Sequence, residues 1–349
     1  MVNHPALTLG NRLVGSDHHP LIIADIGINH NGSLDIAKKM ARLAAQSGCE
    51  CIKHQTHIVE DEMTDEAKEI FPPNDTRSIW DIMDHCALSP DEEIELKRYV
   101  EDLGMIFIST PFSRAATEFL DDIGVPAFKI GSGEADNLPL IEHIASKGKP
   151  VIMSTGMQTI DSIRKSVALL QAADIQIALL ECTNLYPSPP ETVSLRGVTE
   201  LKHAFPDAVV GFSDHSMGPE MALASIPLGA SIIERHFTDT RYRAGPDIAC
   251  SMESPELAFL IARSKEIYVA SINPKQRSFA EESVYKFARG SIVADRDLEA
   301  GKVIQRRDIW ARRPGTGEIA AHEFDAVIGR TINRSVTRNT QLKWSDFDQ

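Results

Sequence analysis

The sequence predicts a (β/α)8 barrel followed by a small, β-rich C-terminal domain. Eight short runs of apolar and β-branched residues recur through the first two thirds of the 349-residue chain, and segments with helical patterning separate them. Parallel strands cannot be joined by tight turns, so this alternation is typical of a barrel whose strands are connected through helices. The eight runs span residues 21–27, 50–55, 105–111, 127–133, 150–156, 177–184, 208–215 and 230–237.

The connecting segments carry the start and stop signals of helices. Ser33 precedes the first connecting helix and Gly48 follows it, while Ser89 and Glu92 form a capping box at the start of a later one. The connector of residues 56–88 is longer than the others and acidic, which is typical either of a loop that covers a substrate or of a surface insertion.

The chain divides into three predicted parts. Residues 1–270 form the barrel, preceded by a hairpin that turns at Gly10 and Asn11 and is placed to close the barrel's bottom. Residues 271–283 are a polar linker, and residues 284–349 change to short β runs and glycine turns. A domain of that size is close to the lower limit for independent stability, so we expect it to pack on a barrel, either its own or a partner's.

The composition excludes several classes of function. The formal net charge of −14 disfavours nucleic acid and anionic membranes as partners, because both require a positive field. The sequence has neither an apolar run of about 18 residues, as a membrane span needs, nor the layout of a signal peptide. We therefore expect a cytoplasmic protein.

Polar residues stand at the C-terminal ends of the predicted strands, where barrel enzymes build their active sites. Most share the alternation of the apolar residues that fill the barrel, so one strand face serves both core and site. Lys129 is out of phase with Ser132, which predicts either a bulge or only one inward side chain. The residues of this rim are Asp25, Lys53, Gln55, Thr110, Ser132, Ser154, Asn184, Ser213, His215 and His236.

Two histidines of this rim suggest a divalent metal site. His215 and His236 end neighbouring strands, so their imidazoles converge, and a pair of imidazoles with water, a carboxylate and a substrate oxygen suits Mn2+, Fe2+, Co2+ or Zn2+. The alternative is a pair of hydrogen-bonded structural histidines.

The remaining rim residues suggest an anionic substrate. Lys53 and Lys129 lie among hydroxyl and amide side chains, a set that binds phosphate or carboxylate, although a single rim lysine is more often a solvated charge. Carboxylates that can hold water, orient a hydroxyl or exchange a proton are Asp25, Glu134, Glu234 and Asp247. The alternative for Asp247 is a helix or turn cap.

A series of ordered motifs resembles bacterial N-acetylneuraminate (sialic acid) synthases over essentially the whole chain, and the C-terminal part resembles their antifreeze-like (SAF) domain. These motifs are ADIGINHNGSL, IKHQTHIVEDEM, FISTPFSRAA, KIGSGE, STGM, CTNLYPSP, GFSDHS, ERHFTD and RRPGTGEI. The resemblance implies condensation of phosphoenolpyruvate with N-acetylmannosamine, with C–O cleavage and release of phosphate. It also implies a metal at His215 and His236, with Mn2+ expected and Mg2+ or Co2+ as alternatives.

The resemblance further implies roles for individual residues. Phosphoenolpyruvate would be held by Lys53, Thr110, Lys129, Ser132, Ser154, Asn184 and Ser213. The amino sugar would be held by Gln55, Asn74, Glu134, Tyr186, Asp247, Phe287 and Arg313. The family exchanges its C-terminal domain between protomers, so a homodimer is expected, with Arg313 of one protomer reaching the sugar in the other's barrel.

One residue departs from the family pattern, and two other functions compete. Asp25 stands where the family typically has glutamate, so we expect activity with an altered rate or metal preference. The nearest rival is a synthase of legionaminate-type or pseudaminate-type sugar acids, although HQTH and the nearby EDEM favour the sialic or legionaminic branch. The other rival is a non-catalytic ice-binding or carbohydrate-binding protein.

Overall fold

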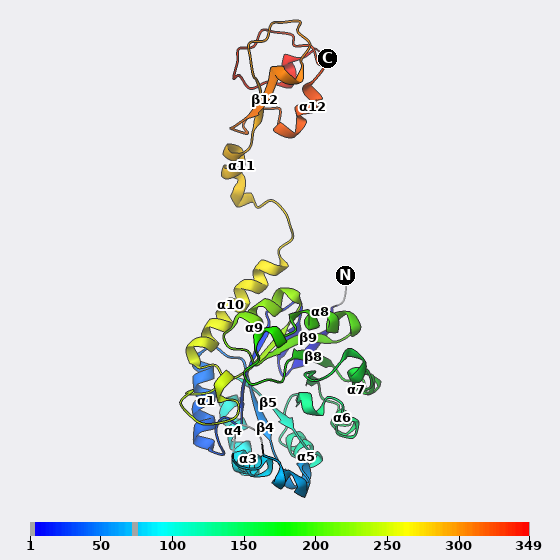
Figure 1. Ribbon diagram of the computed structural model, residues 1–349, viewed down its shortest axis with the longest axis vertical. Helices are drawn as coiled ribbons and strands as arrows, with labels where there is room; N and C mark the ends of the chain where they lie inside the picture. Colours follow the sequence, from blue (N-terminus) through cyan, green and yellow to red (C-terminus); the bar gives the residue numbers. More distant parts are fainter. Residues whose placement is uncertain (1–3, 72–75, 349) are drawn as a thin grey trace. The chain divides into compact units, whose positions relative to one another are not determined.

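The computed structural model describes residues 4–71 and 76–348 and divides the chain into two compact units between Asn273 and Pro274. The first unit is a closed barrel of eight parallel strands in the order β10-β3-β4-β5-β6-β7-β8-β9, which confirms the predicted fold (Figure 1). These strands are β3 Leu21–Gly27, β4 Cys51–Thr56, β5 Ile106–Pro111, β6 Phe128–Ile130, β7 Val151–Ser154, β8 Ile177–Cys182, β9 Val209–Asp214 and β10 Ile232–His236.

Helices surround the barrel and begin and end where the sequence signals are. The Ser33 hydroxyl caps α1, and the capping box of Ser89 and Glu92 opens α4. The connector of residues 56–88 contains the short α2 and α3. The helices of this unit are α1 Leu34–Gln46, α2 Val59–Glu62, α3 Ile79–Cys86, α4 Pro90–Asp102, α5 Arg114–Asp122, α6 Leu138–Ala145, α7 Ile160–Ala172, α8 Leu195–Ala204, α9 Glu220–Ser225 and α10 Ser254–Ile272.

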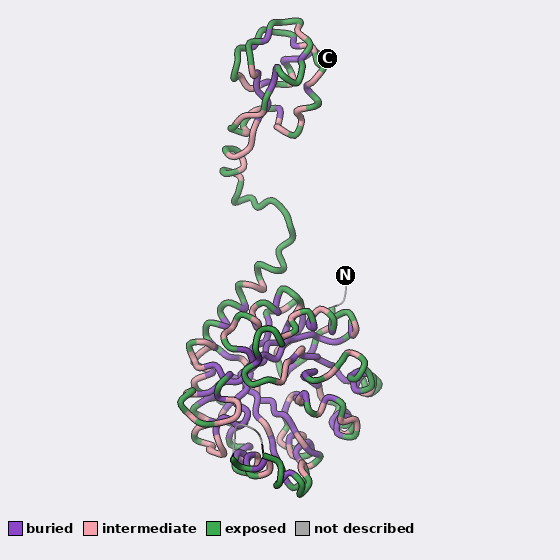
Figure 2. Tube along the Cα trace, viewed as in Figure 1, coloured by how far each residue is buried: buried purple, intermediate pink, exposed green. Residues whose placement is uncertain are grey.

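The two faces of the strands serve two separate cores. Outward side chains pack against the helices, whereas inward side chains such as Ile23, Ile108 and Ile232 fill the barrel. Residues of both sets are buried, and buried residues are concentrated in the interior of this unit (Figure 2). The hairpin of β1 (Ala6–Leu9) and β2 (Arg12–Gly15) adds Leu7 and Val14 to the inner cluster, as a plug of the barrel's bottom should. Apolar side chains thus fill the barrel toward the N-terminal ends of its strands, and polar side chains occupy the C-terminal ends.

The second unit has its own small core. Its antiparallel pair, β11 (Ser291–Ala294) and β12 (Ile309–Arg312), packs with Leu298 and Ile332. It also contains α11 (Glu282–Ala288) and α12 (Phe324–Val327). Among the described residues, no helix combines the length and the apolar character that crossing a membrane requires.

Candidate active site

A cavity of about 240 Å3 opens at the C-terminal ends of the barrel strands. Every predicted rim residue of the barrel lines it. Glu134 and Asn74 are the exceptions among the predicted sugar-binding residues of this unit: Glu134 is not among the lining residues, and Asn74 lies outside the described residues. The lining is Asp25, Lys53, Gln55, Thr110, Lys129, Ser132, Ser154, Cys182, Asn184, Tyr186, Ser213, His215, Glu234, His236 and Asp247, with Ile28, Met83, Phe112, Gly131, Gly133 and Pro246.

Strand register explains most of this convergence. In the parallel pairs Asp25 stands opposite both Lys53 and His236, so three neighbouring strands deliver side chains at one level. Lys129 and Ser132 both line the cavity because β6 ends at Ile130, so strand alternation no longer applies at Ser132. The sequence predicted either a bulge between Lys129 and Ser132 or only one inward side chain. The end of the strand explains their positions without either.

A bulge in β3 shapes the cavity wall beside Asp25. The register shifts between Asp25 and Gly27, and the Gly27 N–H donates to Asp25 Oδ1 at 2.9 Å. Gly27 has a φ of +40°, and a Cβ there would lie 2.9 Å from Gln55 Nε2. A glycine at this position therefore allows both the turn and the close approach of the Gln55 amide.

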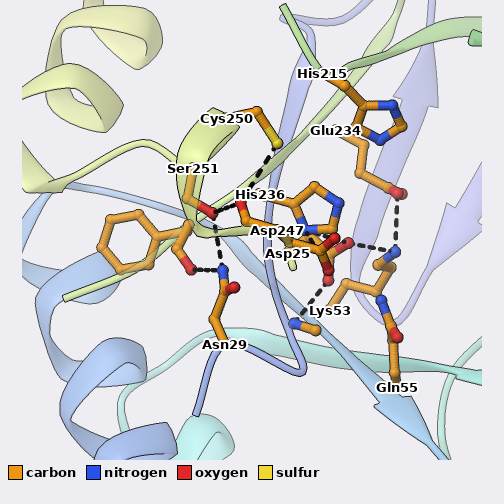
Figure 3. Close-up of polar contacts among 12 residues, drawn as sticks. Asp25, Asn29, Lys53, Gln55, His215, Glu234, His236, Asp247, Cys250 and Ser251 are labelled. Carbon is orange, nitrogen blue, oxygen red and sulfur yellow. Dashed lines mark hydrogen bonds and ion pairs between the residues drawn. The ribbon is translucent and has the colours of Figure 1, made fainter. Parts of the chain in front are cut away.

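Lys53 is the centre of the cavity's charge network (Figure 3). Its Nζ lies 2.7 Å from Asp25 Oδ2 and 2.9 Å from Glu234 Oε1, and all three side chains are buried. Burial by itself lowers the pKa of Lys53, but the carboxylates of Asp25 and Glu234 outweigh it and raise this pKa above its ordinary value. The ammonium group is therefore charged, although it has almost no contact with water.

The positive charge of Lys129 is less fully compensated by carboxylates than that of Lys53. Its Nζ donates to Ser154 Oγ at 2.8 Å and lies 3.6 Å from Glu234 Oε1. Burial lowers the pKa of Lys129, and the neighbouring Lys53 adds to this effect, whereas Glu234 opposes it. An anion bound beside Lys129 would supply the missing negative charge, so this side of the cavity suits a phosphate or carboxylate group.

Glu234, one of the four candidate carboxylates of the sequence analysis, lies in the site, where it contacts two lysines. Burial raises its pKa, but Lys129 and Lys53 outweigh this and lower it, so Glu234 is an ionised bridge between the two lysines. Its position two residues before His236 on β10 was a usable signal, because both then face the barrel interior.

His215 and His236 form a stacked pair, with ring centroids 5.3 Å apart. Nδ1 of His215 donates to the carbonyl of Thr183 at 2.8 Å, which leaves the lone pair on Nε2. Burial, aided by His236, lowers the pKa of His215 to about 3, so this ring is neutral. A neutral imidazole oriented by a backbone carbonyl is the form that binds a metal ion.

The surroundings of His236 also fit a cation. Its Nδ1 has no hydrogen-bond partner, and it lies 3.3 Å from Asp25 Oδ2 and 3.8 Å from Asp247 Oδ2. Asp247 precedes a short 3-10 turn, but its side chain makes no capping hydrogen bond. Within residues 4–71 and 76–348, no three His, Cys, Asp or Glu side chains form a ready-made metal site, so other ligands would come from water or substrate.

A buried ion pair outside the barrel holds the two histidine-bearing strand ends together. Arg235 Nε lies 3.3 Å from Asp214 Oδ2, and each residue directly precedes one of the two histidines. The Arg235 guanidinium also donates to the carbonyls of Ser216 and Gly218, at 2.6 and 2.5 Å. The loop after His215 is thereby fixed to the strand that carries His236.

A second buried cluster lies behind β4, opposite the cavity. His54 Nε2 is 3.1 Å from His30 Nε2, and its Nδ1 is 3.7 Å from Glu93 on α4. Glu93 also accepts from the Thr56 hydroxyl at 2.8 Å. Burial raises the pKa of Glu93 to about 8 and lowers the pKa of His30 to about 4.

Two predicted sugar-binding residues lie in the second unit. Phe287 is exposed on α11, and Arg313 directly follows β12. Their contact with a sugar in a barrel stays a prediction, as do the individual substrate roles of the residues that line the cavity.

Comparison with known proteins assigns this architecture to a family. Residues 40–275 match the NeuB family, and residues 289–348 match the SAF domain. The chain belongs to the NeuB family. Its relatives within the family include N-acetylneuraminate-9-phosphate synthase of Homo sapiens, 34% identical over 84% of this chain and 83% of the relative. Another is N,N'-diacetyllegionaminic acid synthase of Campylobacter jejuni, 33% identical over 93% of this chain and 98% of the relative.

A solved structure supports the same assignment. The N-acetylneuraminic acid (sialic acid) synthetase of Leptospira borgpetersenii, crystallised with citrate, superposes with a TM-score of 0.74 at 28% identity, covering 80% of this chain and 95% of that one. NeuB family relatives that are named for different products are each about one third identical to this chain, so the family is established and the sugar is not.

The cluster behind β4 predicts a pH-dependent stability. Glu93 keeps its proton up to about pH 8 in the folded chain but loses it near its ordinary value of 4.5 when unfolded, so its contribution to stability is lost as pH rises from 4.5 to 8. The lowered pKa of His30 has the opposite effect on stability, because it makes the folded chain less stable as pH falls. This effect occurs only below the ordinary histidine pKa of 6.5. We expect the free energy of unfolding of Glu93→Gln, relative to the unsubstituted chain, to rise by on the order of 1 kcal/mol per unit between pH 6.5 and 8.

Urea unfolding at pH 6.5, 7, 7.5 and 8 measures this difference. Glu95→Gln is the matched control, because Glu95 lies on the same helix with its side chain 59% exposed, and its effect should not change with pH. A pH-independent difference for Glu93→Gln would contradict a raised pKa.

Proposed function

We propose that this chain condenses phosphoenolpyruvate with N-acetylmannosamine to give N-acetylneuraminate and inorganic phosphate. The observation that carries the proposal is the presence of two buried lysines and two buried histidines in one cavity. Burying cationic side chains is costly, so a barrel that merely supported an ice-binding or carbohydrate-binding tail would gain nothing from them. The NeuB family relatives named for sugar acid synthesis support the same class of reaction.

The lysine side of the cavity suits phosphoenolpyruvate. Lys53 and Lys129 supply positive charge, and Ser154 already accepts a hydrogen bond from Lys129, as a phosphate oxygen would. The Thr110 hydroxyl is buried without a partner and so is available to donate to a ligand. Hydroxyl and amide groups that complete the proposed cradle are those of Thr110, Ser132, Ser154, Asn184 and Ser213.

The same cavity is proposed to hold the amino sugar. Gln55, Tyr186 and Asp247, which line it, are proposed to contact the sugar. Asn74, which lies outside the described residues, and Glu134 are proposed to bind the sugar as well. Phe287 and Arg313 would come from a second copy of the chain, so the functional unit is proposed to be a cytoplasmic homodimer with exchanged C-terminal domains.

His215 and His236 are proposed to hold a divalent ion, with Mn2+ expected. When bound, such an ion would polarise the aldehyde oxygen of the open-chain sugar. The lone pair of His215 Nε2 and the unpartnered His236 Nδ1 fit this role.

The cavity then aligns the two substrates for carbon–carbon bond formation. C3 of phosphoenolpyruvate attacks the aldehyde carbon of the sugar, whose oxygen becomes an alkoxide, and C2 becomes oxocarbenium-like. Water adds at C2 and gives up a proton, for which Asp25 is the proposed acceptor because its Oδ2 lies between Lys53 and His236. The alkoxide takes up this proton and becomes a hydroxyl of the product. The tetrahedral intermediate expels phosphate by C–O cleavage, its C2 hydroxyl proton leaves with the phosphate, and the lysines stabilise the leaving anion.

A legionaminate-type synthase is the second candidate. A Campylobacter jejuni relative named N,N'-diacetyllegionaminic acid synthase matches 93% of this chain, which is as strong a likeness as the neuraminate relatives show. That reaction would use the same lysines and histidines and differ only in the sugar part of the cavity.

Phosphate release from phosphoenolpyruvate and each of two sugars tests the proposal. N-acetylmannosamine should be turned over faster than its diacetamido-trideoxy analogue, chelation should abolish turnover, and Mn2+ should restore it. Oxygen-18 in the C–O–P bridge should appear in phosphate. His215→Ala and His236→Ala should each lower kcat by at least about a hundredfold. Fast turnover of the analogue alone would establish the second candidate, and no phosphate release with either sugar would favour the binding protein. Undiminished turnover in both alanine variants would contradict the proposed metal site.

The one-methylene difference at Asp25 gives a separate prediction. Asp25→Glu should keep the carboxylate while moving it toward the substrates, so we expect kcat or metal preference to change by up to about tenfold, and Asp25→Asn to lose most activity. Steady-state kinetics with Mn2+, Mg2+ and Co2+ measures both. An inactive parent chain that becomes active only as Asp25→Glu would contradict the competence of Asp25.

A further inference from the structure

Gln55 is the penultimate residue of β4 and extends its amide into the cavity beside the bulge of β3. Its Oε1 lies 3.2 Å from Nε2 of His57, two residues further along the chain. An amide carries an acceptor oxygen on one side and an NH2 donor on the other, so a group that binds one side determines which side a ligand meets. His57 is such a group.

His57 is itself held on two sides. Its Nδ1 lies 2.8 Å from Glu62 Oε2, and its ring stacks on Phe112 with centroids 4.6 Å apart and an interplanar angle of 11°. The His57 side chain is 2% exposed and that of Glu62 is 10% exposed. The ring therefore has little freedom to turn.

The helix that carries Glu62 is also anchored. Asp61, the residue before Glu62 on α2, accepts from the backbone N–H of Ala115 at 2.8 Å. This bond fixes α2 to the start of α5, which follows β5 in the barrel. The HQTH and EDEM motifs are thus joined in space, because His57 belongs to one and Glu62 to the other.

The geometry fixes the direction of the hydrogen bond to Gln55. A carbonyl oxygen only accepts, so Nε2 of His57 must donate, and Oε1 of Gln55 is occupied by that bond. The NH2 group then faces away from His57, toward Gly27 and the cavity, since Nε2 of Gln55 is the atom that a Cβ at Gly27 would approach. Gln55 therefore presents a donor to whatever binds there.

We propose that His57 and Glu62 are positioning residues that hold the Gln55 amide so that it donates to an acceptor oxygen of an acylamino sugar, either the acyl carbonyl or a hydroxyl. This inference rests on the proposed function, which places an amino sugar beside Gln55. Neither His57 nor Glu62 lines the cavity, so both act through Gln55 rather than on the substrate.

Three histidine variants test the proposal in the full-length protein. His57→Phe retains a ring against Phe112 but removes both hydrogen bonds, whereas His57→Gln keeps a donor that can reach Gln55. His143→Phe is the matched control, because His143 pairs with Glu118 at 2.9 Å on the outer helices α5 and α6.

With N-acetylmannosamine and phosphoenolpyruvate as substrates, His57→Phe should raise KM for the sugar about tenfold, the effect of losing one oriented hydrogen bond, with KM for phosphoenolpyruvate changed less than twofold. His57→Gln should recover most of the loss, and His143→Phe should leave both constants unchanged. An equal rise in both KM values, or no rise in either, would overturn the proposal. Thermal unfolding shows whether each variant still folds. If His57→Phe does not fold, the two KM values of His57→Gln remain the test.

A second measurement needs no turnover. Nitrogen-15 NMR of the imidazoles, with the His57 signals identified by their absence in His57→Gln, reports which ring nitrogen carries a proton. A protonated Nε2 is expected, and an unprotonated Nε2 would overturn the proposed orientation. If the unsubstituted protein turned over no acylamino sugar, the proposed function would fail, while this spectrum would still decide the orientation of Gln55.

Discussion

Lys53 carries a positive charge inside the barrel, where the carboxylates of Asp25 and Glu234 compensate it at 2.7 and 2.9 Å. These three side chains come from β4, β3 and β10, which are consecutive in the closed sheet. The cost of burying one unpaired charge at this depth is several kcal/mol, so each partner requires the others. The barrel register that brings them level also places His236 beside Asp25, and the rest of the cavity is arranged around this network.

The precision of the cavity depends on side chains that do not line it. Arg235 and Asp214 fix the two histidine-bearing strand ends from outside the barrel. Asn29 donates to the carbonyl of Phe237 and to Ser251 Oγ, at 2.9 and 2.8 Å, and so joins the loop after β3 to the loops after β10 (Figure 3). Supporting contacts of this kind keep functional groups within the small tolerance that catalysis allows.

Strand alternation was enough to predict the barrel and most of its rim, because inward residues such as Asp25 and His236 follow the same period as the core. It was not enough at Ser132, where the strand has already ended. It also did not predict that Glu234, one of the candidate carboxylates, contacts lysines of two other strands. The contact of His57 with Glu62 could not be predicted from the sequence either, because it depends on the path of a loop, which has no periodic pattern.

We propose that the buried lysines preorganise an anion site for phosphoenolpyruvate. Calorimetric titration of the metal-loaded protein with phosphoenolpyruvate alone tests it directly, without requiring turnover. We predict one site per chain, a loss of affinity of about a hundredfold or more in Lys129→Met, and unchanged binding in Lys97→Met, whose lysine pairs with Glu101 on the outer helix α4. Undiminished binding by a folded Lys129→Met protein would contradict the account.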